Sequence, residues 1–276
     1  MQNDKPLWQP APERASATLM GQFARAAEQQ TGRTFSDYGQ LWQWSIDDKE
    51  AFWSLVWSFC GVIGERGQRV LVDGNKMPGA KWFPDARLNF AENLLAPRPG
   101  AADDAFVFWG EDKITRQVSR VQLRRSVAQL AAALRDHGIA CGDRIAAYLP
   151  NMPEAAIAML AGASMGAVFT STSPDFGVQG VVDRFGQTLP RVLFAVEGYW
   201  YNGKWIDCRA KLREIVALLP SVERVVLVPY GDIQPSTEGV TNAILFDDFM
   251  APHATVDTND FIALPFDHPL YILYSS

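Results

Sequence analysis

The chain has 276 residues, of which 48% are hydrophobic and 20% charged, with a formal net charge of −6 and nine tryptophans. This composition is typical of a globular protein with a substantial core, and it excludes a disordered or collagen-like chain. No basic run is longer than Arg124-Arg125, so we expect no nucleic acid and no anionic membrane as partner.

No segment has the pattern of a membrane span or a secretory leader. The longest small and apolar stretch, residues 155–169, is broken by Gly162, Ser164 and Gly166 and is shorter than the roughly 18 residues a spanning helix needs. The N-terminus has no apolar secretory core. We therefore expect no membrane span and a cytoplasmic protein.

The cysteines and histidines show no metal-ligand spacing. Cys60, Cys141 and Cys208 are far apart and odd in number, which fits neither a disulfide framework nor a metal cluster. The three histidines are equally scattered. We predict reduced cysteines and no metal site in this chain.

Residues 1–100 are predicted to form a helical extension packed on a larger body. The tryptophan-rich stretch 36–63 carries Phe52, Leu55, Val56 and Phe59 at helical spacing. Residues 84–95 predict a short amphipathic helix, and residues 96–104 read as a linker.

Residues 101–276 are predicted to form an α/β subdomain, which opens with a hairpin and a long helix. Residues 105–112 and 113–119 predict an antiparallel pair. Ser119 and Gln122 form a capping box, and Gly138 marks the end of the helix that follows. Its apolar stripe predicts packing against a sheet.

Apolar strands then alternate with single helices. We predict strands near residues 143–150, 167–173, 191–199, 224–230 and 270–276. The helices between them are predicted after a cap at Asn151, from Ser173-Pro174 onward, and over residues 207–219. Strands that are apolar on both faces and joined by helices favour parallel pairing. The fold class is therefore a doubly wound, mostly parallel α/β sheet flanked by helices.

In such a sheet, ligands bind beyond the carboxyl ends of the strands. The sequence has no G-x-G-x-x-G after the first strand, no complete G-x-x-x-x-G-K-[ST], no G-x-S-x-G and no H-E-x-x-H. A dehydrogenase, a P-loop kinase, an α/β-hydrolase and a zinc peptidase therefore lose support.

Three stretches carry a specific resemblance: "KMPGAKWFPDARLNFAENLL" (76–95), "DRIAAYLPNMPEAAIAMLAGASMGAVFTSTSPDFGVQGVVDRF" (143–185) and "VEGYWYNGKWIDCRAKLREI" (196–215). They resemble the acetoacetyl-CoA synthetases, a family of adenylate-forming acyl-CoA synthetases. The resemblance runs from about Trp42 to the last residue. It implies the first part of the large N-terminal domain of such an enzyme.

The resemblance also implies a two-step reaction. Acetoacetate attacks the α-phosphate of ATP, and the CoA thiol then displaces AMP, with Mg²⁺ offsetting phosphate charge. "YSS" at the end of the chain is similar to the opening of the family's phosphate loop, so Ser275 and Ser276 are implied to bind ATP phosphates. The remaining loop and the catalytic residues of the family lie beyond this point. We therefore expect no catalytic residue in this chain, no activity of the chain alone, and a missing C-terminal portion as its partner.

Part of the CoA site is implied within the chain. Related acetyl-CoA synthetases have a Gly-Gly-Phe turn where this sequence has Ser173 to Phe176, and an arginine pair where it has Lys204 and either Trp200 or Tyr201. Of these, Ser173, Phe176, Tyr201 and Lys204 are the residues that we predict to contact CoA. Lys204 supplies only a point charge in place of an arginine fork. The alternative interpretation of Lys204 is a solvated turn lysine, and the neighbouring aromatic residues 199–205 favour packing over base stacking.

Two other functions stay open at this stage. A non-catalytic nucleotide- or CoA-binding module of the same fold needs no residues beyond Ser276. An unrelated nucleotide-binding α/β domain is more distant. A sequence continuing as Gly-[Ser/Thr]-[Ser/Thr]-Gly-x-Pro-Lys favours the enzyme.

Overall fold

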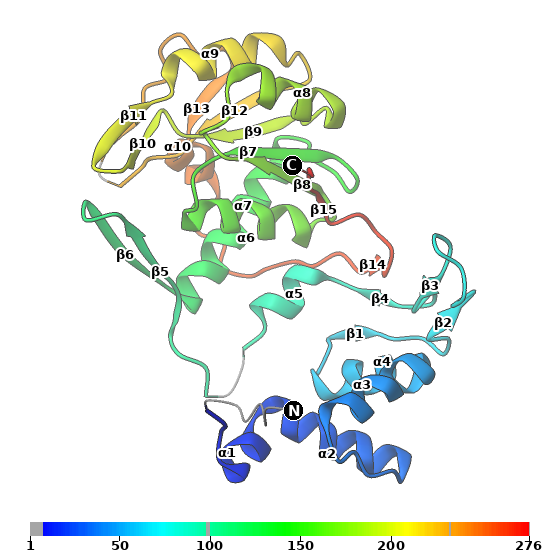
Figure 1. Ribbon diagram of the computed structural model, residues 1–276. Helices are drawn as coiled ribbons and strands as arrows, with labels where there is room; N and C mark the ends of the chain where they lie inside the picture. The colour runs from blue at the N-terminus through cyan, green and yellow to red at the C-terminus, as the bar shows by residue number, and fades with distance from the viewer. Residues whose placement is uncertain (1–7, 98–99, 232, 276) are drawn as a thin grey trace. The chain divides into compact units, whose positions relative to one another are not determined.

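The computed structural model describes residues 8–97, 100–231 and 233–275 (Figure 1). The chain divides into two compact units, Met1–Arg87 and Leu88–Ser276. Each unit has its own cluster of buried hydrophobic side chains.

The first unit is mainly helical. Side chains of Thr18, Asp37 and Asp48 each accept a hydrogen bond from a backbone amide in the first turn of the helix that follows, which fixes where three of the helices begin. The elements are α1 (Pro12–Ala17), α2 (Leu19–Thr31), α3 (Tyr38–Asp47), α4 (Lys49–Phe59) and the two-residue strands β1 (Gly64–Glu65), β2 (Leu71–Val72) and β3 (Lys81–Trp82). A further two-residue strand, β4 (Arg87–Leu88), contains the boundary between the units.

The predicted apolar face of α4 is confirmed. Leu55 is buried, and Phe52, Val56 and Phe59 pack against the same cluster. The ring of Phe52 meets that of Trp44 edge to face, with 5.7 Å between centroids. Phe23 of α2 contacts the rings of Phe52 and Phe59 as well, so aromatic contacts join α2, α3 and α4.

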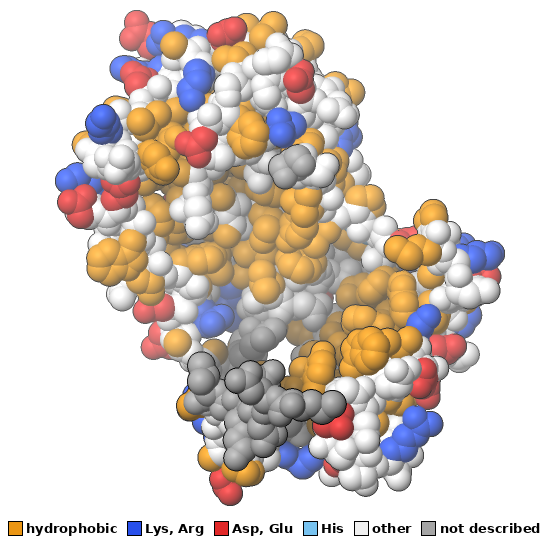
Figure 2. Space-filling view, viewed as in Figure 1, with side chains coloured by type: hydrophobic (Ala, Val, Ile, Leu, Met, Phe, Trp, Pro, Cys, Tyr) orange, Lys and Arg blue, Asp and Glu red, His pale blue; other side chains and the backbone are white. Residues whose placement is uncertain are grey.

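The helices of the first unit also leave apolar surface uncovered. A cavity of about 340 Å³ lies among α2, α3 and α4, and Leu19, Tyr38 and Trp42 at its margin are exposed. Figure 2 shows hydrophobic side chains gathered on the visible face of each unit.

The second unit is built on a six-stranded sheet in the order β13-β12-β9-β7-β8-β15. All five neighbouring pairs are parallel. The strands are β7 (Arg144–Tyr148), β8 (Val168–Thr172), β9 (Val192–Ala195), β12 (Arg224–Leu227), β13 (Ala243–Leu245) and β15 (Tyr271–Ile272). The predicted fold class is confirmed, although the short outer strand β13 was not predicted.

Helices cover both faces of this sheet. Figure 1 shows α6 (Arg120–Asp136) and α7 (Pro153–Ser164) on one face, and α8 (Val178–Thr188) and α9 (Arg209–Leu218) on the other. The capping box predicted at Ser119 is present at the start of α6. The remaining elements are α5 (Phe90–Leu95), β5 (Asp104–Gly110), β6 (Ile114–Ser119), β10 (Gly198–Tyr201), β11 (Lys204–Asp207), α10 (Phe246–Met250), η1 (Ala251–His253) and β14 (Leu264–Pro265).

Two local predictions about helix starts are wrong. Helix α7 is capped by Met152 rather than Asn151, because Pro153 occupies the first helical position that its fixed φ favours. Helix α8 begins at Val178 and not at Ser173-Pro174. The residues between β8 and α8 form a loop instead. The predicted strand at 191–199 is likewise divided into β9 and β10.

After η1 the chain runs back along α6 before it enters β15. The side chains of Gln129 and Arg135 donate hydrogen bonds to the carbonyls of Ala254 and Asp260, at 2.8 and 2.9 Å. Asn259 Nδ2 donates to the carbonyl of Arg124 at 3.0 Å. These contacts position the returning chain so that β15 pairs with the free edge of β8.

Asn89 fastens this return path to two helices. Its Oδ1 accepts from the amides of the first turn of α5. Its Nδ2 donates to the carbonyls of Ala163 (3.1 Å), Ser164 (3.0 Å) and Ile262 (2.9 Å), and the residue is only 1% exposed. A single buried amide thus joins the start of α5, the end of α7 and the segment before β14.

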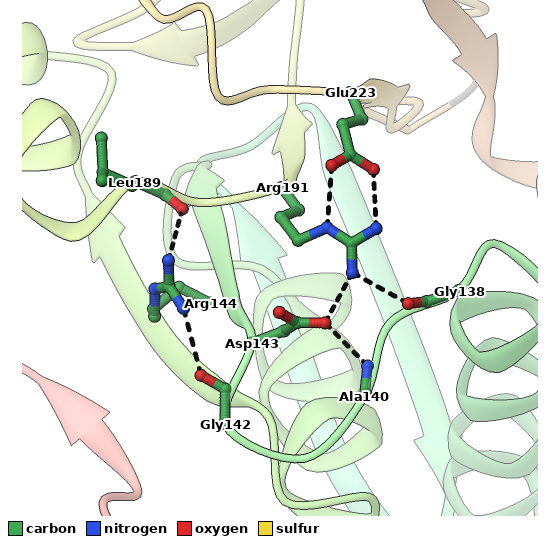
Figure 3. A network of polar contacts seen from close by, with 8 residues as sticks. All are labelled: Gly138, Ala140, Gly142, Asp143, Arg144, Leu189, Arg191 and Glu223. Atoms are coloured by element: carbon green, nitrogen blue, oxygen red, sulfur yellow. Dashed lines mark hydrogen bonds and ion pairs between the residues drawn. The ribbon is translucent and has the colours of Figure 1, made fainter.

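The amino ends of three central strands are joined by Arg191, as Figure 3 shows. Its guanidinium bonds Asp143 at 2.6 Å, the carbonyl of Gly138 at 2.8 Å and both oxygens of Glu223 at 2.9 Å. These partners raise the pKa of Arg191 and lower that of Glu223. All the carboxylates here are paired, so we assign this network a structural role.

The three cysteines are free. Cys60 in the first unit and Cys141 in the second are exposed, whereas Cys208 is buried. Burial raises the pKa of the Cys208 thiol. Within the described residues, no helix has the length and apolar character needed to cross a membrane.

Candidate functional site

The candidate site lies at the carboxyl ends of β7, β8 and β9. The chain leaves β7 toward β8 but returns across β7 to form β9, so the connections diverge at this point of the sheet. Such a switch point leaves a crevice in which α/β proteins bind their ligands. The loop 173–177 between β8 and α8 borders it.

Side chains from distant segments form hydrogen bonds with the backbone carbonyls of this loop. The Tyr148 hydroxyl lies 3.0 Å from the carbonyl oxygen of Pro174 and 3.4 Å from that of Phe176. Lys211 Nζ donates to the same Pro174 carbonyl at 2.8 Å. These contacts engage carbonyls that a helix starting at Ser173 would use, which explains why α8 begins later.

Asp175 is the charged centre of the loop. Ser173 Oγ donates to Asp175 Oδ2 at 2.7 Å, and the Tyr199 hydroxyl donates to the other oxygen, Oδ1. The bond from Tyr199, then that from Ser173 and the charge of Lys211, lower the pKa of the Asp175 carboxyl. Burial and the bond to Asp175 raise the pKa of Tyr199, so at neutral pH the phenol remains a donor to an ionised carboxylate.

The hairpin of β10 and β11 presents two different faces. Its register places Tyr199 opposite Ile206 and Tyr201 opposite Lys204, with Trp200 and Trp205 paired on the other side. The predicted residues Tyr201 and Lys204 therefore share the face that Tyr199 turns toward Asp175. Both are exposed at the end of the hairpin.

The turn of this hairpin is held by a carboxylate. Asn202 and Gly203 have positive φ values of 49° and 70°, as two-residue hairpin turns require. Their amides both donate to Glu111 at the tip of the β5–β6 hairpin, the bond from Gly203 being 2.7 Å long. The position of Lys204 is thereby fixed from outside its own hairpin.

The tryptophan face of the hairpin is mainly packing. Trp200 and Trp205 meet edge to face with 5.7 Å between centroids, and Trp205 lies 6.2 Å from Tyr230. A cavity of about 360 Å³ borders these rings and includes Glu197 and Arg209. The carboxylate of Glu197 accepts from the amide of Ser236, and Arg209 is paired with Asp207.

The predicted phosphate-loop serine follows the edge strand β15. Ser275 is exposed, while Ser276 lies outside the described residues. Thr170 Oγ1 of β8 lies 2.9 Å from the Tyr274 hydroxyl and 3.0 Å from the carbonyl oxygen of Ile272. Both residues of β15 are only half-buried, and Leu273 immediately after it is 80% exposed, so β15 is a half-covered edge strand although its run of residues is apolar.

Some of the predicted residues lie on segments that meet in the structure. Ser173 and the β10–β11 hairpin meet through Asp175, and Phe176 lies in the same loop. Within the described ranges, no three His, Cys, Asp or Glu side chains form a group that would hold a metal ion. Two cationic side chains belong to this arrangement: Lys211, which bonds the loop, and Lys204, which is exposed at the end of the hairpin.

Asp175 and Lys211 were not identified from the sequence, and Tyr199 was identified only as part of an aromatic cluster expected to pack. Strand alternation from Tyr201 would have placed Tyr199 on the same face. Nothing local indicates that Lys211 of α9 reaches the loop, because its partner lies 37 positions away along the chain.

Comparison with known proteins identifies the class. A family model described as AMP-binding enzyme matches residues 97–276, and one described as Acetyl-coenzyme A synthetase N-terminus matches residues 38–94. The chain belongs to the AMP-binding enzyme family.

Its similar relatives are more specific. Acetoacetyl-coenzyme A synthetase of Rhizobium meliloti (strain 1021) is 46% identical over 100% of this chain and 42% of its own length. Malonamoyl-CoA synthetase vrtB of Penicillium aethiopicum is 35% identical over 94% of this chain and 38% of its own length. The solved structure of acetoacetyl-CoA synthetase from Streptomyces lividans has a TM-score of 0.89 and 38% identity, covering 98% of this chain.

The chain spans about two fifths of the length of these relatives. The predicted resemblance to acetoacetyl-CoA synthetases is thus confirmed, because the similar proteins carry that name.

Proposed function

We propose that this chain forms part of an ATP-dependent ligase that joins acetoacetate to CoA. In the first step the acetoacetate carboxylate attacks the α-phosphorus of ATP and releases pyrophosphate. In the second, the CoA sulfur attacks the acyl carbon of the mixed anhydride and AMP leaves. The observation that carries the proposal is 46% identity over the whole chain to an acetoacetyl-coenzyme A synthetase.

We assign the described residues to binding rather than to chemistry. Ser275, with Ser276 outside the described residues, is proposed to begin the ATP phosphate loop. Ser173, Phe176, Tyr201 and Lys204 are proposed to border CoA, because they lie on the loop and hairpin that meet at Asp175. The exposed ammonium of Lys204 suits a phosphate of CoA as a point charge.

Mg²⁺ is proposed to accompany the ATP phosphates. Magnesium keeps several waters and is often bound through substrate phosphates with only one or two carboxylates. This mode of binding does not need a group of three His, Cys, Asp or Glu side chains, and the described residues contain none. Acetoacetate, ATP and CoA are the proposed small-molecule partners, together with the further length of chain that the relatives have.

The domain organisation and location are further proposals. We propose that residues 1–100 act as an extension and residues 101–276 as the first part of the catalytic domain. A cytoplasmic location is proposed from the three free cysteines, since thiols persist in a reducing compartment.

Acetoacetate-dependent exchange of labelled pyrophosphate into ATP tests the first step. The measurement uses a polypeptide that carries this chain within the full length typical of its relatives. We expect exchange there and none from residues 1–276 alone. Nucleotide or CoA binding without exchange in the full-length protein would instead favour the non-catalytic module.

Substrate choice is tested with a panel of acids. Acetoacetyl and malonamoyl groups both carry a carbonyl two carbons from the thioester carbon, and relatives named for each are similar to this chain. We expect acetoacetate to be preferred, malonamate to follow, and acetate and butyrate to be poor substrates. A preference for acetate or a long fatty acid would refute the assignment.

A further inference from the structure

Arg184 lies between the two segments proposed to bind ligands. Its guanidinium carbon is 4.4 Å from the centroid of the Phe176 ring and 5.5 Å from that of the Tyr274 ring. Phe176 belongs to the loop proposed for CoA, and Tyr274 immediately precedes Ser275, proposed for ATP. One side chain of α8 therefore contacts both segments, although they are about a hundred positions apart in the sequence.

A glycine one turn earlier makes this geometry possible. Arg184 folds back along α8 so that Nη1 donates to the carbonyl of Gly180 at 2.8 Å. A Cβ atom at position 180 would lie 3.3 Å from Phe176 Cδ1, which is tighter than side chains normally pack, and 3.5 Å from Arg184 Nη1, which is ordinary van der Waals contact. The absence of a side chain at Gly180 thus lets ring and guanidinium meet beside the helix.

The charge of Arg184 is directed at the rings. Among the described residues, no carboxylate forms an ion pair with it, and the neighbouring Asp183 accepts instead from Gln179 Nε2 at 2.6 Å. A guanidinium within about 6 Å of an aromatic face is attracted by the ring quadrupole. Phe176 and Tyr274 are its aromatic partners in the described chain.

Each segment is also tied to the sheet on its own side. Tyr274 is anchored through its hydroxyl to Thr170 of β8. Phe176 is anchored through its backbone carbonyl to the Tyr148 hydroxyl of β7. Arg184 links these two anchored segments, because it contacts one side chain on each of them.

We propose that Arg184 is a positioning residue that couples the two ligand segments. Through it, the segment proposed for ATP and the loop proposed for CoA adopt their binding arrangement together. The identities of the ligands rest on the proposed function. The coupling itself rests on the contacts of Arg184. Loss of the guanidinium should weaken binding at both segments, because Arg184 contacts a side chain on each of them.

Equilibrium binding of ATP and of CoA to the full-length protein tests the proposal with Arg184→Met, which keeps an unbranched apolar side chain and removes the guanidinium. We expect the Kd for each ligand to rise about five- to tenfold, as loss of a partly buried cation–π contact implies. Arg184→Lys, which restores the charge without the planar group, should recover part of the loss. Arg125→Met on the exposed side of α6 is the matched control and should change neither Kd.

A double-mutant cycle separates coupling from simple loss of packing. Phe176→Leu should weaken ATP binding in the wild-type background, although Phe176 lies on the CoA segment. In the Arg184→Met background the same substitution should leave the Kd for ATP unchanged. Equal effects of Phe176→Leu in both backgrounds would overturn the proposal, as would a lowered Tm with unchanged Kd values.

The outcome also separates this inference from the proposed ligase activity. If both ligands bind and depend on Arg184 while no pyrophosphate exchange occurs, the coupling stands and the ligase assignment fails. If exchange is intact and Arg184→Met binds both ligands normally, the coupling fails and the ligase assignment stands. A protein that binds neither ligand overturns both.

Discussion

Replacing Asn89 by alanine should destabilise the second unit more than any surface substitution. Loss of the helix cap costs about 1 kcal/mol. The side-chain amide of Asn89 has two hydrogens, which three carbonyls share, and the loss of each hydrogen costs about 1 kcal/mol. The cost arises because these carbonyls are buried and have few other hydrogen-bond donors. We therefore expect a loss of about 3 kcal/mol in the free energy of unfolding.

Asn89→Asp sharpens the test, because the carboxylate keeps the acceptor for α5 but cannot donate to the carbonyls of Ala163, Ser164 and Ile262. At 1% exposure, an acid facing three carbonyl oxygens should be at least as harmful as alanine. Asn151→Ala is the control, since Asn151 is exposed and caps no helix. It should change stability by less than about 0.5 kcal/mol.

Urea unfolding followed by far-UV circular dichroism gives the free energy, and hydrogen exchange of the β7 and β8 amides reports the second unit separately. A loss below about 1 kcal/mol for Asn89→Ala, or wild-type stability for Asn89→Asp, would refute the reasoning.

Three further predictions concern charged groups. Y199F removes the donor to Asp175, so the pKa of that carboxyl should rise toward its ordinary value in a carboxyl NMR titration, with a stability loss of about 1 kcal/mol. Burial, and then the charge of Arg224, lower the pKa of His137. Below about pH 6.5 the unfolded chain binds a proton that the folded chain does not, so stability should fall as pH drops through this range, and less steeply in H137Q; an identical slope would contradict this. R191M should lower the free energy of unfolding by about 2 kcal/mol, because two carboxylates and a carbonyl lose their shared partner, whereas R125M should not.

Local rules were sufficient where one segment decides its own structure. The helix α6 follows from its capping box, its apolar stripe and Gly138, whose φ of +86° is suited to a glycine. The parallel sheet follows from strands such as β9, which is apolar throughout, and β7, which is apolar after Arg144, both of them buried on both faces. These features need no knowledge of distant partners.

Local rules failed where distant side chains compete for the backbone. The segment after Ser173 has the proline and apolar spacing of a helix start, yet Tyr148 and Lys211 take the carbonyl of Pro174. The outer strand β13 is only three residues long and depends on pairing with β12. Such outcomes are fixed by tertiary contacts that no short window of sequence contains.

The candidate site shows the same division. Ser173, Phe176, Tyr201, Lys204 and Ser275 were named from a family resemblance, and their roles as ligand contacts stay predictions. Their setting came only from the structure, because the hydrogen bond from Tyr199 to Asp175 and the contacts of Arg184 with two rings join segments that are distant in sequence.

The thiols described above offer a consequence of a different kind. Cys60 and Cys141 are exposed and fall in different units, whereas Cys208 is buried and its pKa is raised. Because the thiolate is the reactive form, Cys208 should resist alkylation while the other two accept it. The native sequence thus carries one attachment point for a spectroscopic label in each unit. The distance between two such labels would test whether the separation of the units changes when the proposed ligands ATP, CoA or acetoacetate are added, with no cysteine introduced.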